Sequence, residues 1–197
     1  NTSMVFLIIA ITGLALISVV AGLDAGVKRL SEINMVLAII LLVFVIIVGP
    51  TLAILTGFFQ NLWAYVEYLP ALSMPFGRED ANFSQGWTSF YWAWWISWSP
   101  FVGMFIARVS RGRTVREFIT CVLIIPSIVS VLWMTSFGGT AIDQIVNQGY
   151  TAVSEAALEL KLFEMLGPLP LAQLTSFVGI CLVIVFFVTS SDSGSLV

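Results

Sequence analysis

Four of the seven tryptophans of this chain fall within seven positions of the stretch FYWAWWISWSPF, residues 90–101. They are Trp92, Trp94, Trp95 and Trp98. The face of an indole ring attracts a cation by about 2 kcal/mol once both are desolvated, and it needs no hydrogen bond from that cation. Closely spaced tryptophans therefore suit a quaternary ammonium group, which has no hydrogen to donate. Packing between helices is the alternative explanation.

A second cluster, TSSDSGS at residues 189–195, holds five hydroxyl groups and one carboxylate. Hard cations prefer oxygen ligands, so Thr189 and Ser190 are candidate ligands for a sodium ion. Asp192 is a candidate to anchor the helix or to relay protons. Ser193 and Ser195 are explained equally well by hydrogen bonds to the preceding helical turn.

The elements that carry both clusters are apolar. Of the 197 residues, 59% are hydrophobic and 10% are charged, whereas soluble domains carry about 25% charged residues. Uncharged apolar runs of about 18 or more residues predict transmembrane helices. The sequence therefore predicts an all-α integral membrane protein. Its five expected spans lie at about residues 4–22, 34–57, 86–107, 117–137 and 174–197.

Two further helices are expected outside the spans. The segment FFQNLWAYVEYLPAL is aromatic and nearly uncharged, which favours a helix at about 58–72 that lies in the membrane interface. The segment TAVSEAALELKLFEML has apolar residues at helical spacing and predicts an external amphipathic helix at about 151–166. Both ends of the sequence fall within apolar runs. We therefore interpret residues 1–197 as part of a single transmembrane domain, an internal piece of a longer chain.

Basic residues indicate which loops face the cytoplasm. Six of the eight Lys and Arg residues lie in two predicted loops, 23–33 and 108–116, which two crossings separate. We expect both loops on the cytoplasmic side of the cell membrane, where they also meet anionic lipids. Arg111 and Arg113 are candidates for a gating or regulatory role. No basic cluster with interleaved aromatic residues stands outside a membrane loop, so nucleic acid is not an expected partner.

The depth of the tryptophans favours cation binding over packing. Trp98 lies near the middle of the third expected span, roughly 15 Å from either surface at about 1.5 Å per residue. Helical spacing aligns it in one stripe with aromatic residues at positions 91, 94, 95, 101 and 105. Interfaces between membrane helices favour small residues, and indoles prevent such close approach. We also expect Ser97, Ser99 and Pro100 to interrupt the helix at this depth.

Three segments resemble the betaine/carnitine/choline family of transporters: GVKRLSEINMVLA (26–38), GWTSFYWAWWISWSPFVGMFIARVSRGRTVREF (86–118) and FFVTSSDSGS (186–195). The resemblance covers essentially the whole chain. It implies a secondary transporter built on two inverted five-helix repeats, of which this chain supplies roughly the sixth to tenth transmembrane helices. It also implies that the family's glycine-rich unwound helix lies upstream of Asn1, and it makes a homotrimer the candidate assembly.

The same resemblance implies roles for individual residues. Some match the tryptophans that enclose the trimethylammonium group of the substrate, and their neighbours would line its pathway. Others match the sodium site of sodium-coupled members. These residues are Trp94, Trp95 and Trp98 for the trimethylammonium group, Trp92 and Phe101 for the pathway, and the carbonyl of Phe186 with Thr189 and Ser190 for sodium.

The sequence thus predicts secondary active uptake of a quaternary-ammonium compatible solute, such as choline or glycine betaine, with sodium as the coupling ion and no cofactor. A proton-coupled choline-type carrier is the alternative, with Asp192 as the coupling group. A channel is a further alternative, which saturable transport driven by an ion gradient would exclude. An intramembrane hydrolase built on Ser193 or Ser195 needs a base, and the chain has no histidine. We therefore do not expect an enzyme.

Overall fold

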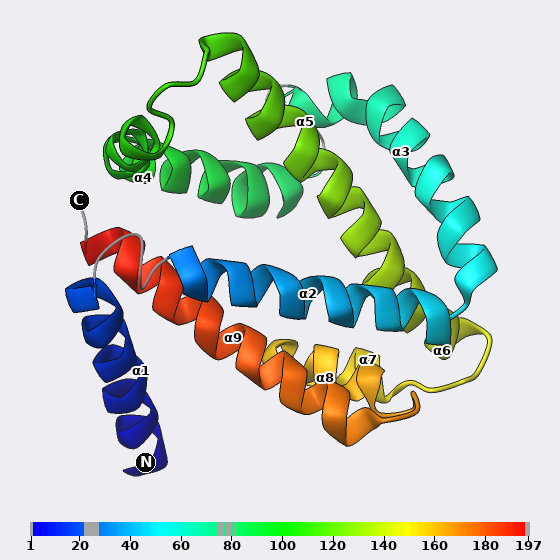
Figure 1. Ribbon diagram of the computed structural model, residues 1–197. Helices are drawn as coiled ribbons and strands as arrows, with labels where there is room; N and C mark the ends of the chain where they lie inside the picture. The colour runs from blue at the N-terminus through cyan, green and yellow to red at the C-terminus, as the bar shows by residue number, and fades with distance from the viewer. Residues whose placement is uncertain (1, 22–27, 75–76, 78–79, 81, 196–197) are drawn as a thin grey trace. The chain divides into compact units, whose positions relative to one another are not determined.

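The computed structural model describes residues 2–21, 28–74, 77, 80 and 82–195, and no strand occurs among them (Figure 1). The predicted all-α class is confirmed. The long helices are α1 (Thr2–Ala21), α2 (Lys28–Val48), α3 (Thr51–Ser73), α4 (Ser89–Val109), α5 (Val115–Trp133) and α9 (Ala172–Ser195). The short ones are the π-helices η2 (Asn82–Thr88) and η3 (Met134–Gly138), α6 (Gly139–Val146), α7 (Ala152–Glu155), the 3₁₀-helix η4 (Leu158–Leu160) and α8 (Lys161–Leu166).

Three helical stretches of the described chain are long and apolar enough to cross a membrane: Lys28–Val48, Val115–Val146 and Ala172–Ser190. They correspond to the second, fourth and fifth expected spans. α1 and α4 lie at the positions of the first and third, whose assignment as spans stays a prediction. Large apolar side chains along all these helices are exposed, as suits surfaces that face lipid or further helices.

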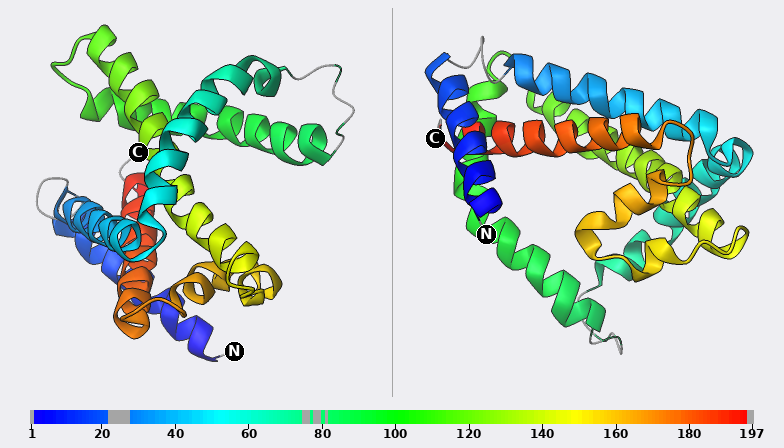
Figure 2. Two further views of the ribbon diagram at one scale, coloured as in Figure 1. Left: turned by 90° about the vertical axis from the view of Figure 1, so that its right-hand side faces the viewer. Right: turned by 90° about the horizontal axis from the view of Figure 1, so that it is seen from below.

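The chain forms two compact units. The first comprises Asn1–Phe58 with Val129–Leu196, and the second is built from Phe59–Ile128. In the first unit α9 lies beside both α1 and α2 (Figures 1 and 2). The described buried core also belongs to this unit, where α2, η3, α7 and α8 meet. Its members are Leu41, Val45, Phe137, Val153, Met165 and Leu166.

The predicted boundary between the second span (34–57) and the interfacial helix (58–72) is wrong, because α3 already begins at Thr51. Pro50 has no N–H to donate to the carbonyl oxygen of Ile46, four residues earlier. The hydroxyl of Thr51 donates to that carbonyl at 2.7 Å instead. The chain therefore leaves α2 and starts α3 without losing this hydrogen bond.

The fourth span, predicted at 117–137, continues further than expected. Helical backbone runs from α5 through η3 and α6 to Val146. Glycines commonly end helices, but Gly138 and Gly139 here keep helical φ angles of −65° and −61°. The ring of Trp133, the last residue of α5, stacks on the ring of Phe137 in η3 with their centroids 4.4 Å apart. This packing favours continuation of the helix through the glycine pair.

The external helix predicted at 151–166 is wrong as a continuous element. The segment divides into α7, η4 and α8, and Ala156 and Ala157 between them have extended ψ angles of 149° and 148°. Val153 of α7 and Leu166 of α8 are both buried in the core, at 5% and 0% exposure. In one straight helix, residues thirteen positions apart would point about 140° away from each other. The break turns both side chains toward the same core.

The two basic loops are shorter than predicted. α2 begins at Lys28, so the basic pair of the first loop (23–33) lies in the first turn of a helix, and that loop up to residue 27 lies outside the described residues. In the second loop, predicted at 108–116, only Arg111 and Arg113 lie between α4 and α5. The other two arginines of that region belong to the helix ends.

Gly49 marks a close approach between the end of α2 and the start of α6. A Cβ atom at this position would lie 2.6 Å from the carbonyl oxygen of Val45 and 3.0 Å from Oγ1 of Thr140. We expect Gly49→Ala to lower the stability of the full-length protein by about 1–3 kcal/mol, because backbone must move to admit the methyl group. Thermal unfolding in detergent measures the loss.

Gly139→Ala is the matched control for this prediction. Gly139 has a helical φ of −61°, and no atom lies within 4 Å of the position of its Cβ. Alanine is favoured over glycine in a helix by about 1 kcal/mol, so this variant should be neutral or slightly more stable. Equal losses in the two variants contradict the close approach at Gly49.

Candidate functional site

The aromatic residues of α4 and of the turn before it form a continuous ladder along one side of the helix. Ring contacts link Trp87 to Tyr91, Tyr91 to Trp94, Trp94 to Trp98, and Trp98 to Phe101, with centroids 5.4–6.2 Å apart. Successive members are three or four residues apart, which is the spacing of one helix face. The aromatic stripe predicted from the sequence is therefore present from Tyr91 to Phe101, and the predicted member Phe105 lies outside this series of ring contacts.

Trp94 is the centre of the ladder. Its ring contacts Tyr91, Trp95 and Trp98, and it is inclined by 66° to the ring of Trp95 and by 54° to that of Trp98. A parallel stack would cover one face of each indole, whereas inclined rings leave faces open. A cation binds over such a face within about 6 Å of the ring centroid. Trp94 and Trp98 are 43% and 48% exposed, so their side chains are accessible in this chain.

The remaining predicted pathway residues differ in their setting. Phe101 ends the series of ring contacts, edge-on to Trp98 with an interplanar angle of 87°. Trp92 is no member of the ladder and is exposed. The family resemblance assigned both residues to the pathway, and helical spacing placed Phe101 in the aromatic stripe. The structure places Phe101 directly beside Trp98 and assigns Trp92 to another side of α4.

The predicted interruption of the third span at Ser97, Ser99 and Pro100 is wrong, since α4 is helical from Ser89 to Val109. Pro100 offers no N–H to the carbonyl oxygen of Ile96. The hydroxyl of Ser99 donates to that oxygen at 2.9 Å. Ser97 likewise donates to a carbonyl one turn back, at 2.9 Å. The serine that precedes the proline thus supplies the hydrogen bond that the proline lacks.

The predicted sodium ligands lie within one turn of α9. Oγ1 of Thr189 donates to the carbonyl oxygen of Phe186 at 3.0 Å, and the exposed Ser190 follows directly. Ion sites of secondary transporters commonly lie at unwound backbone, but α9 is helical from Ala172 to Ser195. The side chain of Asp192 lies outside the described residues.

The chemistry of these oxygens fits a small hard cation. A hydroxyl carries one hydrogen and two lone pairs, so a threonine that donates its hydrogen to a carbonyl, as Thr189 does to Phe186, can still be an oxygen ligand of an ion. A helical threonine also makes such bonds with no ion present. Thr175 in the same helix donates to the carbonyls of Leu171 and Ala172, at 3.2 and 3.1 Å. Thr175 is therefore an internal reference for Thr189.

One buried polar face was missed from the sequence. Ser136, Thr140 and Gln144 are 0%, 1% and 1% exposed on successive turns of η3 and α6. Thr140 donates to the carbonyl of Ser136 at 2.6 Å, and Nε2 of Gln144 donates to the carbonyl of Met165 in α8 at 2.9 Å. Their four-residue spacing is visible in the sequence, but the glycine pair between them suggests a helix end. The hydrogen bond from Gln144 joins α6 to α8.

Hydrogen bonds of Tyr150 also join α6 and α8. The hydroxyl of Tyr150 donates to Oε2 of Glu164 at 3.1 Å, and its backbone N–H donates to the carbonyl of Gln144 at 2.9 Å. Burial raises the pKa of Tyr150, and the hydrogen bond to Glu164 and the negative charge of that group raise it further. The tyrosine therefore stays protonated and keeps donating to Glu164 at neutral pH.

Comparison with known proteins shows which family has a similar sequence. All residues 1–197 match the profile described as BCCT, betaine/carnitine/choline family transporter. The chain is 74% identical, over its full length, to a glycine betaine/proline/choline transporter of Vibrio parahaemolyticus. It is 56% identical over 98% of its length to glycine betaine transporter 1 of the same organism, and 45% identical over 97% to a glycine betaine transporter of Bacillus subtilis. The chain spans 36%, 37% and 38% of these relatives.

The hydrogen bond from Ser99 to Ile96 gives a test of how α4 stays continuous. Ser99→Ala should lower the stability of the full-length protein by about 1 kcal/mol, because the carbonyl of Ile96 then has no donor. In a Pro100→Ala background residue 100 regains an N–H, so the same serine change should have little effect. Thermal unfolding of the four proteins measures this coupling. Additive losses would contradict the compensation.

Proposed function

The chain belongs to the betaine/carnitine/choline family of transporters, and we propose that the whole protein is a secondary active carrier that takes up a quaternary-ammonium compatible solute. The relatives named above are transporters of glycine betaine, and one also of proline and choline. Glycine betaine and choline share a trimethylammonium group. That group is the substrate feature that we expect this chain to bind.

The observation that carries the proposal is the aromatic ladder of α4. Trp94 and Trp98 lie with their centroids 6.1 Å apart and their rings inclined, so both can present a face to one cation. Trp95 contacts Trp94 and extends this cluster. We propose that Trp94, Trp95 and Trp98 hold the ammonium group and that Trp92 and Phe101 line its path. Helix packing alone needs no indoles here.

We propose sodium as the coupling ion, bound by the carbonyl of Phe186 and the hydroxyls of Thr189 and Ser190. The bond between Thr189 and Phe186 supports this, because it brings two of the three oxygens within 3.0 Å of each other. Further ligands would come from the part of the carrier beyond this chain. Proton coupling through Asp192 is the alternative, and a dependence of uptake on pH in place of sodium would favour it.

The orientation and assembly are also proposals. Six of the eight basic residues fall into two regions on the same side of the expected spans, which favours a cytoplasmic position for both. α3 exposes a row of large apolar side chains, among them Leu52 at 76%, Phe59 at 69% and Trp63 at 72%. A homotrimer, by family resemblance, would use such a surface, and α3 is our candidate contact.

The cation site is tested with a graded series at Trp98 in the full-length carrier. Trp98→Phe keeps an aromatic face and should retain partial binding, whereas Trp98→Leu keeps bulk and loses the quadrupole. Loss of one face should weaken substrate affinity about tenfold, which corresponds to about 1–2 kcal/mol. Uptake of radiolabelled glycine betaine and choline, with and without a sodium gradient, measures the series.

Trp87→Leu is the control for this series, because Trp87 belongs to the same ladder but lies two turns from Trp94. It should leave substrate affinity close to that of the native carrier. A substrate isostere with carbon in place of the charged nitrogen should compete poorly. If this isostere competes well and Trp98→Leu binds as well as Trp98→Phe, the tryptophans serve packing only.

The ion site is tested by Thr189→Ala and Ser190→Ala in the full-length carrier. Each removes one proposed oxygen ligand, so each should raise the sodium concentration for half-maximal uptake more than it changes substrate affinity at saturating sodium. Thr175→Ala is the matched control, since it removes the same kind of hydrogen bond from the same helix. A shift of equal size in the Thr175 variant, or none in the other two, refutes the site.

A further inference from the structure

A groove lies between the last turns of α4 and the first turns of α5, within the second unit. It has a volume of about 230 Å³. Phe105 and Ile106 of α4 line one wall, and Phe118, Cys121 and Val122 of α5 line the other. Apart from the thiol, these side chains are hydrocarbon. The long part of the groove is therefore an apolar channel along two helices that we propose to be membrane spans.

The loop end of this groove is polar and carries a positive charge. Ser110 and Arg113 complete its lining there. The hydroxyl of Ser110 donates to the carbonyl of Ile106 at 2.7 Å, so its hydrogen is already used. The guanidinium of Arg113 is therefore the group at this end that offers several donors.

The nearest acidic side chain does not consume these donors. Glu117 accepts hydrogen bonds at Oε2 from the backbone N–H and the hydroxyl of Thr114, at 3.1 and 3.0 Å, and its own N–H donates to that hydroxyl at 3.3 Å. This reciprocal pair caps the start of α5. Among the described residues, no carboxylate forms an ion pair with Arg113. The hydrogen bonds from Thr114 stabilise the carboxylate of Glu117, and the charge of Arg113 does so to a smaller degree. The N–H groups of the guanidinium at the end of the groove thus remain available to an anion.

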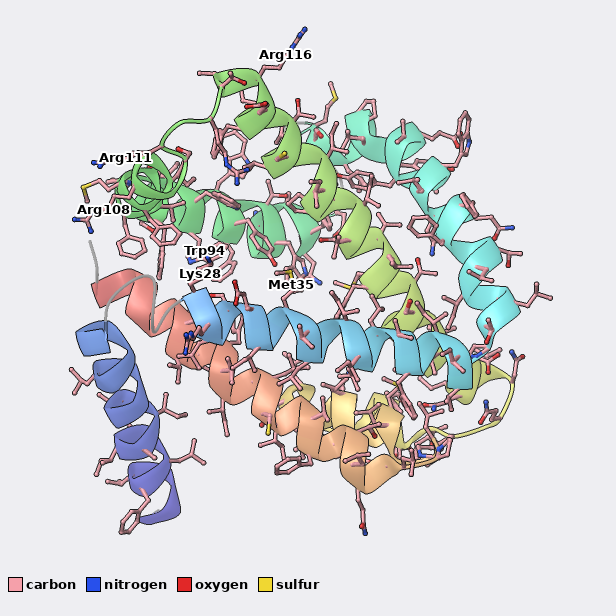
Figure 3. All side chains as sticks on the ribbon, viewed as in Figure 1. Lys28, Met35, Trp94, Arg108, Arg111 and Arg116 are labelled. Carbon is pink, nitrogen blue, oxygen red and sulfur yellow. The ribbon has the colours of Figure 1, made fainter. Side chains whose placement is uncertain are left out.

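The surroundings add to this charge. Arg108 at the end of α4, Arg111 in the loop and Arg116 in the first turn of α5 surround the region, and Figure 3 shows Arg116 projecting away from the protein. Four arginines against one glutamate make this loop strongly positive. An occupant with a negative head and an apolar tail matches both ends of the groove.

We propose that this groove binds one anionic phospholipid of the inner leaflet. Its phosphate accepts hydrogen bonds from the guanidinium of Arg113, whose fork of N–H groups suits phosphate oxygens. One acyl chain lies between Phe105 and Phe118 and continues past Val122. The assignment to the inner leaflet rests on the proposed orientation of the carrier. A free phosphate ion would leave the apolar walls unused, and diffuse attraction to anionic lipid would not distinguish Arg113 from its neighbours.

The groove is separate from the substrate site. No tryptophan lines the groove, and Phe105 follows Trp98 by seven residues on the same helix, which is about 10 Å at about 1.5 Å per residue. The phosphate of a lipid at Arg113 would therefore lie beyond the tryptophan cluster, toward the loop. Loss of lipid and loss of substrate binding can be measured independently, so failure of one proposal leaves the other standing.

The test counts lipids retained by the purified full-length carrier in native mass spectrometry, after reconstitution with phosphatidylglycerol or with phosphatidylcholine. The native carrier should retain one phosphatidylglycerol in preference to phosphatidylcholine. Arg113→Gln should weaken this retention about tenfold, the loss expected for one charge-assisted hydrogen-bonded pair. Arg113→Lys keeps the charge and should retain an intermediate amount. Cys121→Phe leaves all charges in place but fills the apolar channel, so it should also lose the lipid.

Arg111→Gln is the matched control, because it removes the same charge from the same loop without touching the groove. It should retain the lipid as the native carrier does. Equal losses in the Arg111 and Arg113 variants would show diffuse attraction and overturn the proposal. Retention in Cys121→Phe would overturn the role of the apolar channel. If the native carrier shows no preference for phosphatidylglycerol, the whole proposal is overturned. This would also be the result if another part of the protein covers the groove.

Discussion

Within a bilayer, each backbone carbonyl must find its hydrogen-bond donor inside the protein, since an unsatisfied group there costs several kcal/mol. Proline has no N–H, so the carbonyl four residues earlier needs another donor. At Pro50 and at Pro100 a neighbouring hydroxyl supplies it, from Thr51 in the first case and from Ser99 in the second. The outcomes differ because Gly49 precedes Pro50 and lets the chain turn, whereas α4 continues through Pro100.

The continuity of α4 decides what its aromatic residues can do. Phe101 follows Pro100, and it contacts Trp98 only because the helix keeps its rotation through that position. A break at Pro100, as expected from the sequence, would have ended the ladder at Trp98. The hydroxyl of Ser99 therefore bears on the proposed substrate site although it would not contact the substrate. Its role is to hold the backbone on which the aromatic residues stand.

Local patterns in the sequence predicted the elements that depend on local spacing. The aromatic stripe and the apolar helices follow from the period of the α-helix, and both are present in the structure. Patterns of this kind could not predict features that depend on distant contacts. The division of residues 151–166 arises because Val153 and Leu166 face one core, and the early end of α2 involves a close approach between Gly49 and Thr140. The groove at Arg113 likewise requires two helices to be placed side by side.

The two threonines of α9 show how burial separates a structural hydroxyl from one that could bind an ion. Both donate to helix carbonyls, so their hydrogen bonds alone do not distinguish them. Thr175 is 5% exposed, and its remaining lone pairs therefore face packed side chains. Thr189 is half-buried beside the exposed Ser190, so both side chains reach the surface of the helix. Coordination of a cation by these two hydroxyls would not require α9 to unwind, so a continuous helix is compatible with the proposed sodium site.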